Sequence, residues 1–251
     1  MQGNTIFITG GGSGIGRGLA EALHKLGNKV IIAGRRQAKL DEVVAANPGI
    51  DAMAFDASDP ASIEATAAKL MEHYPDLNVL INNAGIMARD QAGGKIDDEV
   101  LTSQVTTNLL GPIRLTSALI DQIKSQQGTI IYTTSILAFV PLTLAAVYSA
   151  TKAAIHSYIL SQRVLLKDSG VRVLEIAPPR VASELMKARG SKPPMPLDAF
   201  IAETMKELGT DKDEILIEGT QPFRNNPGPN EIGLVEKIGA DMLASLQGAS
   251  S

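Results

Sequence analysis

The sequence predicts an α/β protein with a single-domain, Rossmann-like, doubly wound parallel sheet that carries helices on both faces. Three observations indicate this fold class. Short β-branched runs alternate with amphipathic segments, the runs are apolar almost throughout, and a glycine-rich turn directly follows the first of them. The chain has 251 residues, of which 44% are hydrophobic and 20% are charged. This length and balance fit one domain, which we expect to cover residues 1–251.

Six of the β-branched runs, such as TIFIT and KVIIA, predict strands that are apolar on both faces. The segments between them have the apolar spacing of helices, and the acidic triplet DDE at residue 97 favours a helix start because carboxylates meet the positive end of the helix dipole. In chain order, the expected strand–helix pairs are 5–9 with 13–26, 29–33 with 37–46, 51–56 with 60–74, 79–82 with 97–126 and 129–134 with 149–167, and the sixth strand is 171–177.

The regular alternation of strands and helices ends at residue 183. Beyond it the chain is rich in Pro and Gly, as in SKPPMP and RNNPGPN, and we expect only a helix at 197–208 and a short strand at 214–217. Irregular stretches beside a binding site often close over the ligand. We therefore expect residues 183–210 to form a substrate lid within the same domain.

Composition excludes several classes of function. The net charge is −4, from 23 basic and 27 acidic residues without a long run of either sign, so we expect no nucleic-acid partner and no membrane partner. The chain has no cysteine, which excludes disulfides and thiolate chemistry. The N-terminal stretch MQGNTIFITG does not resemble a signal peptide, and the longest apolar run, 136–147, is too short to span a bilayer. We expect a cytoplasmic protein.

The glycine-rich turn TGGGSGIG at residues 9–16 predicts a dinucleotide site. Gly10, Gly14 and Gly16 have the spacing G-x-x-x-G-x-G, which lets the backbone turn tightly and approach a pyrophosphate at a helix N-terminus. The alternative, a flexible loop, is disfavoured by the strand before the turn and the amphipathic helix after it. The expected contacts are Gly10, Gly12, Ser13, Gly14, Ile15 and Gly16.

The end of the second strand favours NADP(H) over NAD(H). It reads IIAGRR, with Gly34 where an acidic residue would bind a ribose hydroxyl, and Arg35 and Arg36 directly after it. A guanidinium binds a 2′-phosphate through charge-assisted hydrogen bonds, whereas a carboxylate would repel it. The alternative is two solvated surface arginines.

The stretch VYSATKAAIH at residues 147–156 places Tyr148 four residues before Lys152, so the two side chains share one face of a helix. A single pairing of this kind also arises by chance. Taken together with the turn, however, it resembles the short-chain dehydrogenase/reductase family, in its single-domain branch. The likeness runs from residue 5 to about residue 183 and includes DASD at 56–59, NNAG at 82–85 and TTNLLGP at 106–112.

The resemblance implies an active site and further cofactor contacts. It assigns catalysis to Asn108, Ser135, Tyr148 and Lys152, with Ser135 thirteen residues before Tyr148. It adds contacts to the adenosine side of the cofactor from Asp56, Ala57, Asn83, Ala84 and Gly85, and contacts to the nicotinamide end from Tyr148, Lys152, Pro178, Val181 and Ser183. The chain departs from the family where Pro179 replaces the usual glycine, which stiffens the backbone and removes one amide donor.

These residues predict interconversion of a carbonyl and an alcohol by hydride transfer. A carbonyl that accepts hydride needs a proton donor, and the pKa of a tyrosine, ordinarily near 10, is lowered by a neighbouring ammonium. Ser135 would donate a second hydrogen bond to the substrate oxygen. By resemblance, Lys152 also holds the nicotinamide ribose, and Asn108 fixes a water that passes protons to it. Separately, each has a simpler interpretation: a strand-end cap for Ser135, a helix-surface polar residue for Asn108 and a solvated charge for Lys152.

The stretch ILAFVPLTLAAV, between Ser135 and Tyr148, predicts an apolar wall that suits a small, apolar aldehyde or ketone, or else core and interface packing. Met87 and Arg89 are further candidates for substrate contact. His24, His73 and His156 have no ligand partner at metal spacing, so we expect no metal.

Two other functions are compatible with the fold: a non-catalytic NADP-sensing regulator, which could dispense with the Ser-Tyr-Lys set, and dehydration or epimerisation of a sugar nucleotide, which usually needs a longer C-terminal region. The resemblance also implies a homo-oligomer, with a tetramer favoured, built on the long helices after the fourth and fifth strands.

Overall fold

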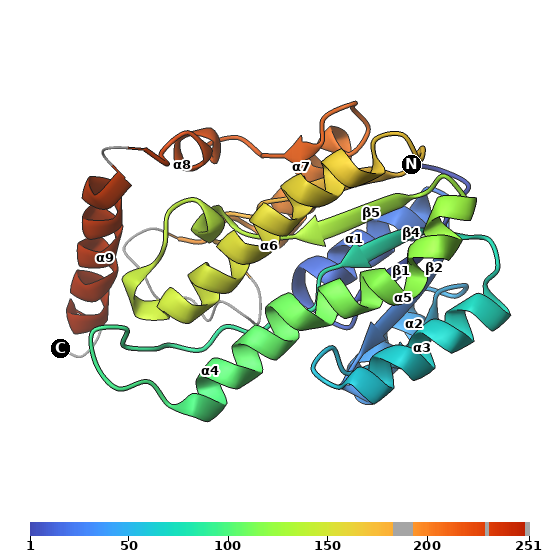
Figure 1. The fold of residues 1–251 in the computed structure, drawn as a ribbon, viewed down its shortest axis with the longest axis horizontal. Helices are drawn as coiled ribbons and strands as arrows, with labels where there is room; N and C mark the ends of the chain where they lie inside the picture. Colours follow the sequence, from blue (N-terminus) through green and yellow to red (C-terminus); the bar gives the residue numbers. More distant parts are fainter. Residues whose placement is uncertain (183–192, 229–230, 249–251) are drawn as a thin grey trace.

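The computed structural model describes residues 1–182, 193–228 and 231–248. Within these ranges seven parallel strands form one sheet in the order β3-β2-β1-β4-β5-β6-β7 (Figure 1). The direction of winding reverses between β1 and β4, which is where open α/β sheets bind ligands. The strands are β1 (Thr5–Thr9), β2 (Lys29–Gly34), β3 (Asp51–Ala54), β4 (Leu77–Asn82), β5 (Thr129–Thr133), β6 (Arg172–Ile176) and β7 (Glu214–Ile215).

Two layers of helices cover the sheet, because successive side chains of each strand point to opposite faces and both sets are apolar. On β1, Ile6 and Ile8 pack into one core, whereas Phe7 packs into the other. The first core is closed by α1 (Gly14–Lys25), α2 (Gln37–Ala46) and α7 (Leu197–Glu207). The second is closed by α3 (Pro60–His73), α5 (Gly111–Ser125) and α6 (Ala146–Leu166), which lie on the near side of the sheet in Figure 1.

The fold class and the six main strands are confirmed, and two helices differ from the prediction. The single helix expected at 97–126 is divided into α4 (Asp98–Val105), a π-helical turn (Thr106–Leu110) and α5. Asp97 caps α4 by accepting a hydrogen bond from the backbone N–H of Glu99, in agreement with the helix start predicted from the acidic triplet DDE. Helix α6 begins at Ala146, three residues earlier than expected, so Tyr148 lies in its first turn.

The C-terminal part contains more structure than the Pro- and Gly-rich sequence indicated. A short helix, α8 (Gln221–Arg224), and a long one, α9 (Glu231–Gly248), follow β7. Within the segment expected to form a lid, 183–210, residues 197–207 form α7, whose Phe200 is fully buried in the first core. Residues 183–192 lie outside the described part of the chain. Among the described residues, no helix has both the length and the apolar character needed to cross a membrane.

Candidate active site

A cavity of about 900 Å³ opens at the carboxyl ends of the strands. Its wall combines residues that follow β1, β2, β4, β5 and β6, because the carboxyl ends of parallel strands meet at one edge of the sheet. The predicted site residues in this wall are Gly10, Gly12, Ser13, Gly14, Ile15, Arg35, Arg36, Asp56, Ala57, Asn83, Ala84, Gly85, Ser135, Tyr148, Lys152, Pro178 and Val181.

The glycine-rich turn has the geometry of an anion cradle. Gly10 and Gly14 have φ angles of 71° and 54°, which side-chain-bearing residues rarely adopt. A Cβ placed on Gly16 would fall 2.3 Å from the carbonyl oxygen of Gly10, so only glycine lets α1 start this close to the turn. Gly16 therefore shapes the turn without lining the cavity. The turn ends at the N-terminus of α1, whose unpaired N–H groups favour a phosphate.

The two arginines after β2 lie beside this turn. Arg36 donates from Nη2 to Ser13 Oγ at 2.7 Å, and Arg35 also lines the cavity. Asp56 is fixed by Ser58, whose backbone N–H and hydroxyl both donate to Oδ1, at 2.9 and 2.7 Å. Burial alone would raise the pKa of Asp56, but these bonds and the charge of Arg35 hold it below its usual value.

The segment after β4 is tied to the end of β1. Asn83 donates from Nδ2 to the carbonyl of Thr9 at 3.0 Å, and the backbone N–H groups of Asn83 and Ala84 donate to Thr9 Oγ1. These bonds join the two strands on either side of the switch point. They fix the floor of the cavity between the glycine turn and the Tyr148 region.

Tyr148, Lys152 and Ser135 meet at the opposite end of the cavity. Lys152 Nζ donates to the carbonyl of Thr133 at 2.8 Å and lies 5.5 Å from the centroid of the Tyr148 ring. The side chain of Ser135 acts on Tyr148, whose pKa it lowers, and it accepts from the N–H of Leu137 at 3.1 Å, so it also caps the 3-10 turn at Ile136–Ala138. Lys152 is only 4% exposed, which excludes a solvated surface charge.

Burial dominates the titration of both groups. It raises the pKa of Tyr148 to about 12, against the opposing hydrogen bond from Ser135. It lowers the pKa of Lys152 to about 8, against the opposing charge of Glu175. The low pKa expected for Tyr148 is therefore not a property of the protein groups alone: Lys152 donates to a backbone carbonyl here, and a further positive charge is needed to favour the phenolate.

Asn108 lies in the π-helical turn and is buried, so it is not a helix-surface residue. Its Oδ1 accepts from the N–H of Ile86 at 2.9 Å, and its Nδ2 donates to the carbonyl of Ile86 at 2.8 Å and to Thr151 Oγ1 at 3.3 Å. These bonds hold the segment after Gly85 against α6. Asn108 is not in the cavity wall, although a Cβ on Gly85 would touch both its Oδ1 and Lys152 Nζ.

The apolar stretch before Tyr148 divides between wall and core. Leu137 and Leu142 line the cavity, whereas Phe139 and Val140 are buried in a separate core cluster. Of the remaining candidates, Arg89 is exposed and does not line the cavity, and Ser183 lies outside the described residues. Met87 does line the cavity.

Several residues of the cavity wall were not predicted from the sequence. Leu234 and Ile238 of α9 and Phe223 of α8 close the end of the cavity nearest Tyr148, and Lys39 lines the end nearest the arginines. The i,i+4 apolar pair Leu234–Ile238 was the available signal for α9. The surrounding Gly and Pro residues obscured it, and its packing partners are distant in sequence.

Comparison with known proteins gives one consistent result. The family model described as short chain dehydrogenase matches residues 4–194. The chain is 37% identical over 227 residues to a Bacillus subtilis protein named uncharacterized oxidoreductase DltE, and the match covers 90% of this chain and 89% of that protein. It is 30% identical over 250 residues to an NADP-dependent 3-hydroxy acid dehydrogenase of Schizosaccharomyces pombe, covering 91% of this chain and 95% of the relative.

A solved structure agrees with the sequence relatives. The structure of a short chain dehydrogenase from Burkholderia cenocepacia in complex with NADP superposes with a TM-score of 0.83 at 25% identity, covering 94% of this chain and 98% of that one.

Proposed function

The chain belongs to the short-chain dehydrogenase family, and from this premise we propose that it is an NADP(H)-dependent oxidoreductase that interconverts an aldehyde or ketone with its alcohol. One observation carries the proposal: Ser135, Tyr148 and Lys152 line the same cavity as the glycine-rich turn. A proton donor, a second hydrogen-bond donor and a cation thus face the space that a dinucleotide bound at the turn would enter.

The residues present fit an NADP(H) cofactor. The turn at 10–16 offers a pyrophosphate site that glycine alone can form, and Arg35 and Arg36 offer cations where a 2′-phosphate would lie. The adenosine half would be held by Asp56, Ala57, Asn83, Ala84 and Gly85. The nicotinamide end would be held by Pro178 and Val181. Bound NADP(H) would supply the hydride and, when oxidised, a positively charged ring. Arg35 and Arg36 favour NADP(H) over NAD(H) because their guanidinium groups can bind the 2′-phosphate. Gly34 carries no carboxylate that would repel this phosphate.

The side chains of the site would manage charge and protons. As negative charge develops on the substrate oxygen, Tyr148 donates its proton to that oxygen and Ser135 donates a hydrogen bond. The tyrosinate left behind needs a nearby cation, since burial holds the pKa of Tyr148 at about 12. Lys152, whose Nζ is 5.5 Å from the ring centroid, is the side chain placed to supply it. Asn108 would support the return of a proton to Lys152 through water.

The apolar wall supports a small, apolar carbonyl substrate. Leu137, Leu142, Leu234 and Ile238 surround the space beside Tyr148 and present no charge there. The charged wall residues Lys237 and Asp241, also from α9, mark the outer part of the cavity, because both are exposed.

Two features of assembly belong to the proposal. The two cores share one sheet, which supports a single domain over residues 1–251. Val164 and Leu165 on α6 are 68% and 82% exposed, and large apolar groups at this exposure support a contact with another copy of the chain, as in the proposed homotetramer.

The test is turnover by Tyr148→Phe. The wild-type protein should oxidise NADPH in the presence of an apolar aldehyde or ketone, followed at 340 nm, and the variant should lose at least about 100-fold in kcat while it still binds NADPH, measured by fluorescence. Turnover retained by the variant would remove Tyr148 as the proton donor. Tight NADPH binding by the wild type without turnover across a broad carbonyl panel would favour the NADP-sensing alternative.

A further inference from the structure

A carboxylate is buried directly behind the proposed catalytic residues. Glu175 lies on β6, is 1% exposed, and points to the α6 side of the sheet between Val173 and the end of the strand. A buried carboxylate is strongly unfavourable unless hydrogen bonds and opposite charges compensate it. Its burial on β6, next to the edge strand β7, therefore calls for a role, and the sequence predicted none.

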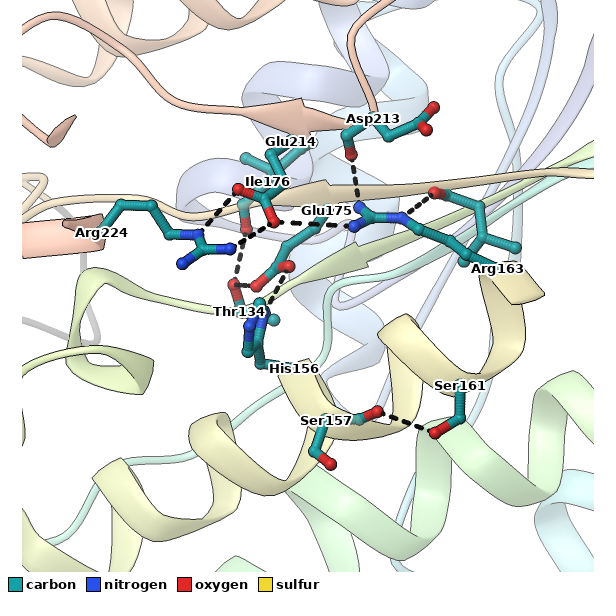
Figure 2. Close-up of polar contacts among 11 residues, drawn as sticks. Thr134, His156, Ser157, Ser161, Arg163, Glu175, Ile176, Asp213, Glu214 and Arg224 are labelled. Atoms are coloured by element: carbon teal, nitrogen blue, oxygen red, sulfur yellow. Dashed lines mark hydrogen bonds and ion pairs between the residues drawn. The ribbon is translucent and has the colours of Figure 1, made fainter. Parts of the chain in front are cut away.

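Both carboxylate oxygens of Glu175 have partners (Figure 2). Thr134 donates from Oγ1 to one oxygen at 2.7 Å, and His156 Nδ1 lies 2.7 Å from the other. A carboxylate only accepts hydrogen bonds, so His156 carries its proton on Nδ1. Thr134 is further held by its backbone N–H, which donates to the carbonyl of Ile176 at 2.8 Å.

Thr134 is the middle one of three consecutive residues that reach the site. The carbonyl of Thr133 accepts from Lys152, the hydroxyl of Thr134 donates to Glu175, and the side chain of Ser135 acts on Tyr148 by lowering its pKa. The bond from Thr134 to Glu175 thus lies between the two groups that contact the proposed acid and the proposed cation. Its loss would leave this strand end held by backbone hydrogen bonds alone, so the side chain of Ser135 would be less firmly positioned.

The charge of Glu175 also acts on Lys152. Burial lowers the pKa of Lys152 to about 8, and the charge of Glu175 acts in the opposite direction. Without that charge the pKa would fall further, and the lysine would lose its proton at a lower pH. From its other sides, Lys152 faces the ring of Tyr148 and the backbone carbonyl of Thr133, and Gly85 lies near its Nζ.

An outer layer of charge surrounds Glu175. Glu214 on β7 bonds Arg224 at 2.8 and 3.1 Å and lies 3.7 Å from Arg163. Although His156, Glu175 and Glu214 place ligand atoms within 4.8 Å of one another, the two guanidinium groups already supply the positive charge that a metal ion would bring. Of the charged groups around Glu175, Lys152, His156 and Arg224 interact with it, Glu214 has a carboxylate oxygen within 4.8 Å of it, and Arg163 pairs with Glu214.

We infer that Glu175 is a positioning residue for the reaction: its bonded carboxylate holds Thr134 and thereby the strand end that presents Ser135, and it sets a negative charge near Lys152. This inference rests on the proposed function, because it assigns Glu175 to the same reaction. Glu175 does not line the cavity, so it acts only through its neighbours.

The experiment compares Glu175→Gln with the matched control Glu214→Gln. Both remove one carboxylate of the same cluster, but Glu214 contacts neither Thr134 nor Lys152. For carbonyl reduction, we expect Glu175→Gln to lower kcat about tenfold at pH 8 with little change in KM, and to move the alkaline fall of kcat about one pH unit lower. The control should keep the wild-type kcat and pH profile. Equal behaviour of both variants and the wild type overturns the inference.

Two further variants separate position from charge. Thr134→Val removes the hydrogen bond and keeps the carboxylate, so kcat should fall while the pH profile stays in place. Glu175→Asp keeps the charge but is too short to reach Thr134 in the same way, so it should behave like Thr134→Val. If Glu175→Gln does not fold, these two variants decide, and a wild-type kcat in both overturns the inference.

A measurement without turnover keeps this inference distinct from the proposed function. In urea unfolding of the wild type, Glu175→Gln, Lys152→Met and the double variant, a double-mutant cycle should give about a tenfold coupling in the unfolding equilibrium constant at pH 6.5. The coupling should vanish at pH 10, where Lys152 is neutral. This result would stand even if no carbonyl were reduced. A cycle without coupling at pH 6.5 overturns the inference even if the wild type is an active reductase.

Discussion

Lys152 is expected to lower the stability of the fold in which it acts. It is 4% exposed, and burial lowers its pKa from 10.5 to about 8. The unfolded chain therefore binds the lysine proton more tightly than the native chain does. The difference between these pKa values corresponds to roughly 3 kcal/mol of lost stability at any pH well below 8.

Lys152→Met removes the charge and keeps an unbranched side chain of similar length. The substitution also removes the hydrogen bond to the carbonyl of Thr133 and leaves that acceptor buried, which costs about 1–2 kcal/mol. We therefore expect the free energy of unfolding to rise by about 1–2 kcal/mol at pH 6.5, while turnover is lost.

The sign of this effect depends on pH. Below pH 8 the lysine is protonated in both states of the wild type, and the full cost of burying the charge is present. Between pH 8 and 10.5 the native lysine is neutral and the unfolded one is still charged, so the wild type becomes relatively more stable as pH rises. Near pH 10.5 the variant should have no advantage and should show only the loss of the hydrogen bond.

The assay is urea unfolding at pH 6.5 and pH 10 at one protein concentration, since oligomerisation would also change the apparent stability. Lys69→Met, at an exposed lysine on α3, is the matched control and should change the free energy of unfolding by less than about 0.5 kcal/mol at either pH. A Lys152→Met variant that is less stable than the wild type at pH 6.5, or equally altered at both pH values, would refute the reasoning.

Three further predictions concern the cofactor and the assembly. Gly16→Ala should abolish NADPH binding in a fluorescence titration, because its Cβ would fall 2.3 Å from a backbone carbonyl of the turn; an unchanged Kd would contradict the cradle. The double variant Arg35→Ala/Arg36→Ala should weaken NADPH about tenfold or more and leave NADH nearly unchanged, since only the 2′-phosphate loses its charged partners. Equal loss for both nucleotides would contradict this assignment. Val164→Lys/Leu165→Lys should dissociate the proposed tetramer in size-exclusion chromatography without loss of helical circular dichroism, and an unchanged elution volume would place the interface elsewhere.

The parts of the protein that follow local rules were predictable from the sequence. The strand and helix alternation depends on side-chain period, and the i,i+4 spacing of Tyr148 and Lys152 fixes their common face whatever surrounds them. Likewise, the glycine turn requires backbone angles that its own residues allow. For these reasons the fold class, the position of the turn and the common face of Tyr148 and Lys152 could be derived before the structure, whereas the place of Ser135 beside them followed only from the family resemblance.

The remaining features depend on contacts between distant segments, which the sequence does not encode by spacing. Glu175 meets Thr134 and His156 only because β5, β6 and α6 pack together, and α9 reaches the cavity only through its packing on the loop before α6. The depth at which Tyr148 is buried was likewise not evident from the sequence, and this burial raises its pKa to about 12. The sequence by itself determined which groups are present and which of them are local neighbours. The tertiary structure alone decided how deeply each group is buried and which distant charge compensates it, because desolvation and long-range packing arise only when the chain has folded.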